Sequence, residues 1–209
     1  GKKLTPGRGG MLAGAELLHH PSAGSTYLNF YYDIGNAAPE EMPYLNLLTD
    51  VVDELDTGKH TAQELNTLRN TWLGRSGAWV DGWTGRQPGR PVHAKLVAGM
   101  SLLERSLEKA VELGGEWLYE TKLTGPQAEA AMERVVSQQK LMMEQRFLRE
   151  GHAFASMRAA AHFSVEAAMN ERCSGVSYYH FLCGLQEGAD WAGLGRKLSL
   201  IHISEPTRH

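Results

Sequence analysis

The chain has 209 residues, of which 42% are hydrophobic and 22% are charged, and its formal net charge is −3. This composition is typical of a globular protein with a sizeable core, and the charge gives no electrostatic reason to expect nucleic acid or an anionic membrane as partner. No apolar run of about 18 residues is present, so the sequence predicts no membrane-spanning helix. Cys173 and Cys183 are the only cysteines, too few for a disulfide scaffold or a four-cysteine zinc site.

The first segment, residues 1–24, is rich in glycine and proline, which favours a connector with a short helical turn near Ala15–Leu18. The pattern then changes, because apolar and polar side chains alternate over residues 26–33. This alternation is typical of a half-buried strand. The side chains expected to face the core are Leu28, Phe30 and Tyr32.

Two helices are predicted after this strand. Apolar side chains recur at helical spacing from Leu45 to Leu55, and Thr57-Gly58 ends the run. The second helix is expected to begin at Thr61-Ala62-Gln63-Glu64, a capping box in which the Thr and Glu side chains accept hydrogen bonds from each other's backbone amides. Its apolar face comprises Leu65, Leu68 and Trp72.

Two more strands are predicted at residues 77–83 and 92–99, with a hairpin loop at 85–91 between them. A further helix should follow, interrupted at Gly114-Gly115. Its inward side chains are expected to be Leu103, Leu107, Ala110 and Leu113.

A long helical block is predicted after Gly125-Pro126, and a last helix at Ser177–Leu185. The apolar stripe of the long block comprises Met132, Val136, Met143, Phe147 and Phe154. The order strand, helix, helix, strand, strand, helix and helical tail predicts an α+β fold. In it, an antiparallel sheet carries helices on one face, as in a split β-α-β arrangement without its closing strand. The fold is therefore expected to be incomplete at its C-terminus, with one sheet edge unpaired.

A search for catalytic motifs finds neither H-E-x-x-H, H-x-x-E-H nor G-x-S-x-G. His19-His20 are adjacent and would point in different directions on a helix, and no carboxylate or thiol completes a ligand set with His152 and His162. The sequence therefore predicts no catalytic, cofactor-binding or metal-ligating residue in this chain. Packing in the core or at an interface is favoured over nucleic-acid stacking for four tryptophans, Trp72, Trp79, Trp83 and Trp117.

Several separated segments resemble the presequence proteases, which belong to the pitrilysin/insulysin metallopeptidases. The two longest are Gly151–Ala159 (GHAFASMRA) and Ser174–Leu182 (SGVSYYHFL). The strand Tyr27–Asp33, the segment Pro43–Thr49 and the helix start Thr61–Leu65 also resemble this family. Order and spacing are kept throughout residues 26–186.

The resemblance implies a long chain whose two similar halves close around an unstructured peptide. The first half of such enzymes holds the inverted zinc motif, whose Glu acts as general base, and the second half supplies chamber walls together with an Arg and a Tyr that help bind substrate. This chain is similar to the region that joins the halves and to the start of the second half. No segment matches the zinc motif or the later Arg/Tyr motif. His152 and Arg158 match the family pattern without a chemical role, and a structural hydrogen-bonding role is favoured for both.

The family resemblance predicts a connector (1–24) and a truncated non-catalytic α+β domain (25–197). The tail (198–209) is separately similar to a translated sequencing adapter and is expected to be an artefact. The function expected is the non-catalytic wall and hinge of a zinc endopeptidase that degrades short unfolded peptides. Zinc would belong to the full-length enzyme, and the partners would be the catalytic N-terminal half and unstructured peptides. The alternative is a stand-alone peptide-binding or partner subunit. The cytoplasm of a bacterium is the preferred compartment, with an organellar matrix as the alternative.

Overall fold

The structure, a computed structural model, describes residues 2–4, 17–19, 25–34, 37–84 and 92–202. Its strands are β1 (Lys2–Leu4), β2 (Leu17–His19), β3 (Thr26–Asp33), β4 (Arg75–Thr84) and β5 (Val92–Leu102). Its α-helices are α1 (Met42–Val51), α2 (Ala62–Trp72), α3 (Leu107–Tyr119), α4 (Pro126–Ala160), α5 (Val165–Ser174), α6 (Val176–Gly188) and α7 (Trp191–His202). Two 3-10 helices, η1 (Val52–Glu54) and η2 (Glu104–Ser106), precede α2 and α3.

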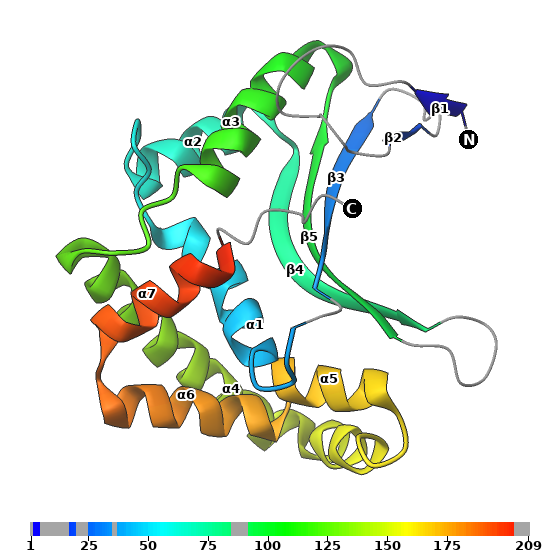
Figure 1. The fold of residues 1–209 in the computed structure, drawn as a ribbon, viewed down its shortest axis with the longest axis vertical. Helices are drawn as coiled ribbons and strands as arrows, with labels where there is room; N and C mark the ends of the chain where they lie inside the picture. The colour runs from blue at the N-terminus through cyan, green and yellow to red at the C-terminus, as the bar shows by residue number, and fades with distance from the viewer. Residues whose placement is uncertain (1, 5–16, 20–24, 35–36, 85–91, 203–209) are drawn as a thin grey trace.

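The main sheet has the strand order β3-β5-β4, and both pairings are antiparallel. Strands β3 and β4 therefore run in the same direction on either side of β5, with α1 and α2 in the connection between them. This is the predicted split β-α-β arrangement. Helices α1 and α5 contact β4 and α3 contacts β5, while the opposite side of the sheet carries none of the described helices (Figure 1). The predicted α+β class, with helices on one face of the sheet, is confirmed.

The predicted strand at residues 26–33 is confirmed, both in its bounds and in which side chains face the core. Exposed and partly buried residues alternate along β3, with Tyr27 and Tyr31 outward and Phe30 against the core. The capping box at the start of α2 is present in both directions, with the Thr61 hydroxyl accepting from the Glu64 amide and the Glu64 carboxylate accepting from the Thr61 amide. These local patterns predict structure because neighbouring residues alone decide them.

In the N-terminal segment, the predicted helical turn near Ala15–Leu18 is wrong where it can be compared. Leu17 and Leu18 belong to β2, which pairs antiparallel with β1. The predicted hairpin loop at 85–91 lies outside the described residues, but the strands on its two sides pair as a hairpin requires.

The helix α3 runs through Gly114-Gly115 without the predicted interruption. A Cβ atom at Gly114 would lie 2.7 Å from Cε of Met100, so the absent side chain lets the helix approach β5 closely. The predicted inward positions are also partly wrong: Leu103 and Leu107 are 46% and 43% exposed, whereas Leu113 is buried.

The long helix α4 supplies the centre of the helical core. Its predicted apolar stripe is confirmed, because Met132, Val136, Met143 and Phe154 are all at most 4% exposed. Phe147 packs edge-on against Phe154 with ring centroids 4.6 Å apart, a favourable aromatic geometry. The helix kinks at Glu150, whose backbone has φ −124° and ψ 25°.

The buried guanidinium of Arg69 joins the helices to the sheet. Arg69, on α2, is 4% exposed and lies 4.0 Å above the ring of the fully buried Trp117 of α3. It also donates hydrogen bonds to Asp53 Oδ1 of η1 (2.6 Å) and to Ser76 Oγ of β4 (2.9 Å). One side chain thus fixes two helices, a turn and a strand relative to one another.

Helix α7 closes the helical layer. Leu198 is fully buried, and Lys197 places its ammonium 3.6 Å from the ring centroid of Tyr44 on α1. Residues 203–209 lie outside the described residues, and the adapter origin of residues 198–209 stays a prediction. No helix in the described ranges has the length and apolar composition that crossing a membrane requires.

Candidate functional site on the open face of the sheet

The face of the main sheet that points away from the helices is defined by the strand register. Its four cross-strand rows are Tyr27–Ser101–Arg75, Asn29–Gly99–Gly77, Tyr31–Val97–Trp79 and Asp33–Lys95–Asp81, each with the β5 residue in the middle. We call these residues the open face. Strand β3 is far in sequence from the hairpin formed by β4 and β5, so the fold brings the residues of β3 to those of the hairpin.

The centre of the open face is aromatic. Tyr31 and Trp79 flank Val97, which is fully buried although no described helix lies on this side. Tyr27, Tyr31 and Trp79 themselves keep 69%, 57% and 42% of their surface exposed. Large aromatic groups exposed together on one face are typical of binding surfaces rather than of ordinary protein exterior.

Gly99 leaves space on this surface that two neighbouring side chains occupy. A Cβ atom at position 99 would lie 2.7 Å from Cη2 of Trp79 and 2.6 Å from Oδ1 of Asn29, so both side chains lie directly across the central strand. Gly77, the partner of Gly99 in β4, has nothing within 4 Å of its Cβ position. The glycine on β5 is therefore required for the packing of Trp79, and the one on β4 is not.

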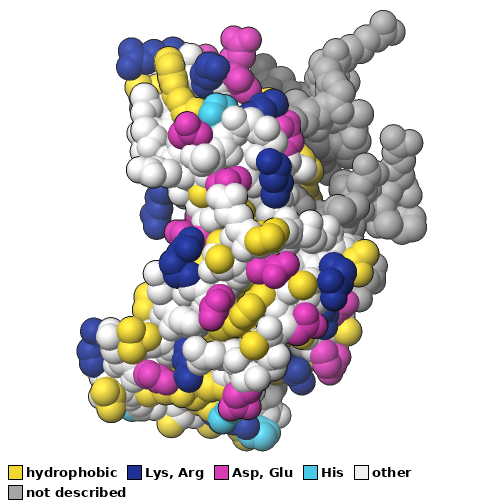
Figure 2. Space-filling view, turned by 90° about the vertical axis from the view of Figure 1, so that its left-hand side faces the viewer, with side chains coloured by type: hydrophobic (Ala, Val, Ile, Leu, Met, Phe, Trp, Pro, Cys, Tyr) yellow, Lys and Arg dark blue, Asp and Glu magenta, His cyan; other side chains and the backbone are white. Residues whose placement is uncertain are grey.

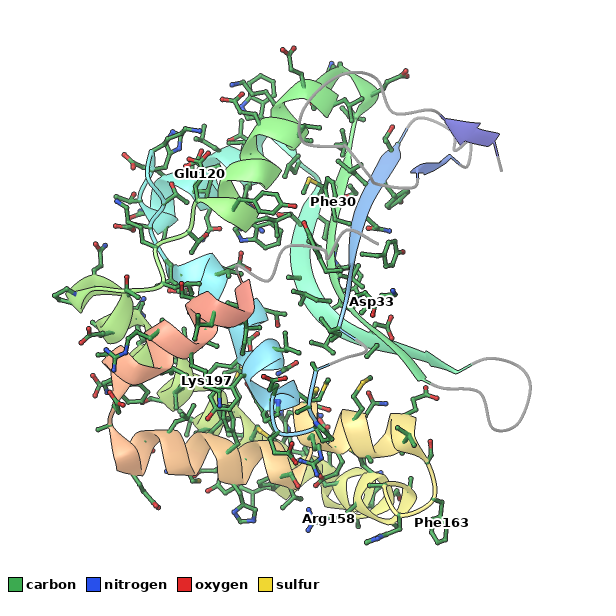
Figure 3. All side chains as sticks on the ribbon, viewed as in Figure 1. Phe30, Asp33, Glu120, Arg158, Phe163 and Lys197 are labelled. Atoms are coloured by element: carbon green, nitrogen blue, oxygen red, sulfur yellow. The ribbon has the colours of Figure 1, made fainter. Side chains whose placement is uncertain are left out.

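One end of the open face is charged. Lys95 Nζ lies 2.7 Å from Asp33 Oδ2, and the exposed end of β3 where Asp33 sits is marked in Figure 3. Such a surface ion pair contributes little to stability, because water screens both groups. Together the rings, the Asn29 amide and this ion pair offer stacking, hydrogen bonding and charge to a bound chain.

The side chains of the open face and its surroundings do not fit a zinc site. In the described ranges no three His, Cys, Asp or Glu side chains gather closely enough to hold one ion. A catalytic zinc needs three such protein ligands.

The buried carboxylate of Glu116 contacts the turn that precedes α2. Glu116 on α3 is 2% exposed, accepts a hydrogen bond from the Thr57 hydroxyl, and lies 2.9 Å from Nδ1 of His60. Burial alone would raise the pKa of Glu116, but the hydrogen bonds from Thr57 and His60 outweigh it and lower the pKa below its ordinary value of 4.5. The contact fixes the 57–60 turn to α3. His60 also lines a shallow pocket of about 360 Å³ with Gln63, Glu64, Thr67 and Leu68.

A second buried carboxylate, that of Glu171, accounts for the position of the Arg158 side chain. Nη1 of Arg158 lies 2.8 Å from Oε1 of Glu171 and 3.0 Å from Oγ of Ser177, so Arg158 joins α4 to α5 and α6. Glu171 also accepts the Ser177 backbone amide at 3.0 Å. Burial would raise the pKa of Glu171, but these hydrogen bonds and the charge of Arg158 lower it. Arg158 therefore has the structural role favoured from the sequence, whereas His152 is an exposed residue on the outer side of α4.

The tryptophans divide between core and surface. Trp117 is fully buried, whereas Trp72 and Trp79 are 43% and 42% exposed. The side chain of Trp83 lies outside the described part of the structure. Sequence reasoning recognised the outward positions of β3 but not the open face, because its partners on β4 and β5 follow only from the register. It also missed Glu116 and His60, which carry no motif.

Comparison with known proteins places the chain in a family. Residues 12–185 match the family described as associated with peptidase family M16, subfamily C. The chain is 27% identical over 199 residues to presequence protease 1, chloroplastic/mitochondrial, of Arabidopsis thaliana, a match that covers 93% of this chain. It is 23% identical over 177 residues to protein HypA of Clostridium perfringens strain 13, covering 83% of this chain.

Because the family match covers most of its length, the chain belongs to this peptidase-associated family. The predicted resemblance to presequence proteases is confirmed at this level. The chain spans 18% of the length of each of the two relatives it matches.

The two glycines of the open face allow a matched test of its packing. Gly99→Ala should lower the free energy of unfolding by about 1–3 kcal/mol, because the added methyl group displaces the Trp79 ring. Gly77→Ala, which adds the same atom to open space in the same cross-strand row, should change it by less than about 0.5 kcal/mol. Urea unfolding followed by tryptophan fluorescence measures both. Equal effects of the two substitutions would contradict the close packing described for Gly99.

The lowered pKa of Glu116 predicts a pH dependence with a definite sign. Because the folded-state pKa lies below 4.5, the ionised carboxylate stabilises the fold fully above that pH, and the stabilisation is lost as the pH falls through the folded-state pKa. Glu116→Gln should lower the free energy of unfolding by about 1–3 kcal/mol at pH 7. The difference from the unsubstituted chain should shrink below pH 4.5. Urea titrations across this range measure it, and Glu187→Gln, on the exposed end of α6, is the control. A difference that does not shrink in acid would refute the assignment.

Proposed function

We propose that this chain forms a non-catalytic wall of the peptide chamber in a zinc metalloendopeptidase that degrades short unfolded peptides. The observation that carries the proposal is the open face, a sheet surface that carries none of the described helices and exposes Tyr27, Tyr31 and Trp79. Membership of the peptidase-associated family supports the peptidase context. The name of the Arabidopsis relative, presequence protease, supports peptides as the substrate class.

The shape and chemistry of the open face suit an extended peptide. A peptide without secondary structure exposes its side chains and all its backbone amides and carbonyls. Aromatic rings can pack against its apolar side chains, and the Asn29 amide can exchange hydrogen bonds with its backbone. Strands β3 and β4 also form the two outer edges of the described sheet, where an extended chain can add by main-chain hydrogen bonds. A folded protein would not expose its backbone, and it would be too wide to lie along the open face as an extended peptide can.

In this proposal the zinc centre lies in a catalytic N-terminal half of the same, longer protein. The chain covers 18% of each relative, which leaves ample length for such a half. Zinc would supply the water nucleophile there, while the residues of this chain bind and orient the peptide. Residues 1–24 would connect the two parts and act as the hinge.

The proposal predicts that Trp79 contributes to peptide binding and that Trp72 does not. The two side chains are exposed to the same degree, 42% and 43%, but Trp72 is the last residue of α2 and belongs to none of the strands of the open face. Trp79→Ala should weaken binding of a fluorescently labelled unstructured peptide about fivefold, the loss of about 1 kcal/mol expected for an aromatic interface residue. Trp72→Ala should leave it unchanged. Fluorescence anisotropy gives the dissociation constants.

Circular dichroism of both variants shows whether the fold is retained. Because Trp79 also packs on Gly99, Tyr27→Ala serves as a second variant that removes a mostly exposed ring from the same face. Equal affinity of the open-face variants and the Trp72 variant would contradict the proposal. If the open-face variants lose binding but the longer protein has no peptidase activity, the chain serves as a peptide-binding partner instead.

A further inference from the structure

The hydrogen bonds between β3 and β5 decide which main-chain groups β3 turns outward. The Ile34 amide donates to the Ala94 carbonyl at 3.2 Å, and these two residues continue the β3–β5 register as an opposed pair. Hydrogen-bonded and non-hydrogen-bonded pairs alternate along an antiparallel ladder. The even-numbered residues of β3 therefore bond to β5, and the odd-numbered ones direct their amides and carbonyls to the outer edge. Of these, Tyr27 and Asn29 have no main-chain hydrogen-bond partner in the described part of the chain.

The two outer edges of the sheet differ in what surrounds them. Helices α1 and α5 pack against β4, whereas β3 packs mainly on β5. On β4, Gly82 lies opposite Ala94, whose main-chain groups face β3, so Gly82 directs its own amide to the outer edge. That amide already donates to the Asp81 carboxylate at 2.8 Å. The edge of β3 is therefore the less obstructed of the two.

The side chains along the edge of β3 are uncharged and mostly aromatic. Residues 26–32 have the sequence TYLNFYY, without a charged residue, a proline or a glycine. Edge strands that stay unpaired usually carry charged side chains or proline, which discourage the addition of another strand. Charged side chains of both signs are instead spread over the helical side of the molecule, which Figure 2 shows. Strand β3 thus has the composition of a strand that accepts a neighbour.

We propose that the edge of β3 at Tyr27 and Asn29 binds an extended, uncharged peptide segment as a further strand of the sheet. This inference rests on the proposed function and deepens it, because it assigns one edge and one class of peptide segment. Each residue of the added strand lies on the same face as the β3 residue opposite it. Opposite Tyr27 it lies beside an exposed ring of the open face, and opposite Leu28 it lies beside a partly buried side chain packed on the core. β-Branched and aromatic residues suit both positions, whereas a charged residue opposite Leu28 would lose water without gaining a partner.

Amide hydrogen exchange in the 209-residue chain, resolved by NMR, tests the proposal. The probe is a peptide of alternating valine and threonine with lysines at its ends for solubility, and the anisotropy of its fluorescein-labelled form gives the saturating concentration. At saturation the amides of Tyr27 and Asn29 should exchange about tenfold or more slowly, because they donate to the peptide. The Gly82 amide, at the outer edge of β4, should exchange at an unchanged rate. A peptide with aspartate in place of every valine should bind about fivefold more weakly.

Two substitutions at position 29 separate the main-chain contact from the side chain. Because Asn29 does not bond to β5, proline there removes only an outward amide, which is the position in a sheet where proline is tolerated. Asn29→Pro should therefore weaken binding of the valine–threonine peptide about fivefold more than Asn29→Ala does. Circular dichroism shows whether both variants keep the fold, and the exchange measurement on the unsubstituted chain does not depend on either.

The outcomes separate this inference from the proposed function. If the peptide does not bind at all, the proposed function fails and the inference fails with it. Binding that leaves the exchange of Tyr27 and Asn29 unchanged would retain the open face as the site and overturn strand addition at β3. Slower exchange at Gly82 alone would place the peptide on β4 and also overturn it. Slow exchange of Tyr27 and Asn29 without peptide, increasing with protein concentration, would show instead that a second copy of the chain occupies the edge.

Discussion

The guanidinium of Arg69 is the interaction on which the arrangement of helices and sheet depends. A charge that is only 4% exposed must be paired, and Arg69 is paired by Asp53 and Ser76 and by the ring of Trp117. Loss of one partner of such a buried charge costs about 3–5 kcal/mol, a large part of the stability of a domain. The contact holds α2 and α3 on one side of the sheet. The opposite side of the sheet, which carries none of the described helices, is the open face.

Two further buried carboxylates extend the same principle through the helical layer. Glu116 fixes the turn before α2, and Glu171 with Arg158 fixes the junction of α4, α5 and α6. Each carboxylate is almost fully buried yet has a lowered pKa, because its hydrogen-bond partners outweigh the cost of burial. These buried polar groups therefore stabilise the framework of the protein.

How much of this could be predicted from the sequence depended on how local the determining contacts are. Alternation in residues 26–33 and the Thr61–Glu64 capping box were sufficient for β3 and the start of α2, since neighbouring residues decide them. Gly114-Gly115 was misinterpreted as a break because its contact, Met100, lies on another element. The open face could not be predicted for the same reason, because the contact of Trp79 with Gly99 depends on the register of β4 with β5. The family resemblance indicates the peptidase context and no chemical role for Arg158, and the partners of its structural role, Glu171 and Ser177, are defined only by the packing of three helices.

The central claim is that the open face lines a chamber that holds unfolded peptides. Photo-crosslinking in the longer polypeptide tests it most directly, with a benzophenone amino acid in place of Tyr27 on the open face or of Trp72 on α2. The account predicts that an unstructured peptide is captured from position 27 and not from position 72. Capture from position 72 alone, or from neither position while the peptide is being cleaved, would contradict it.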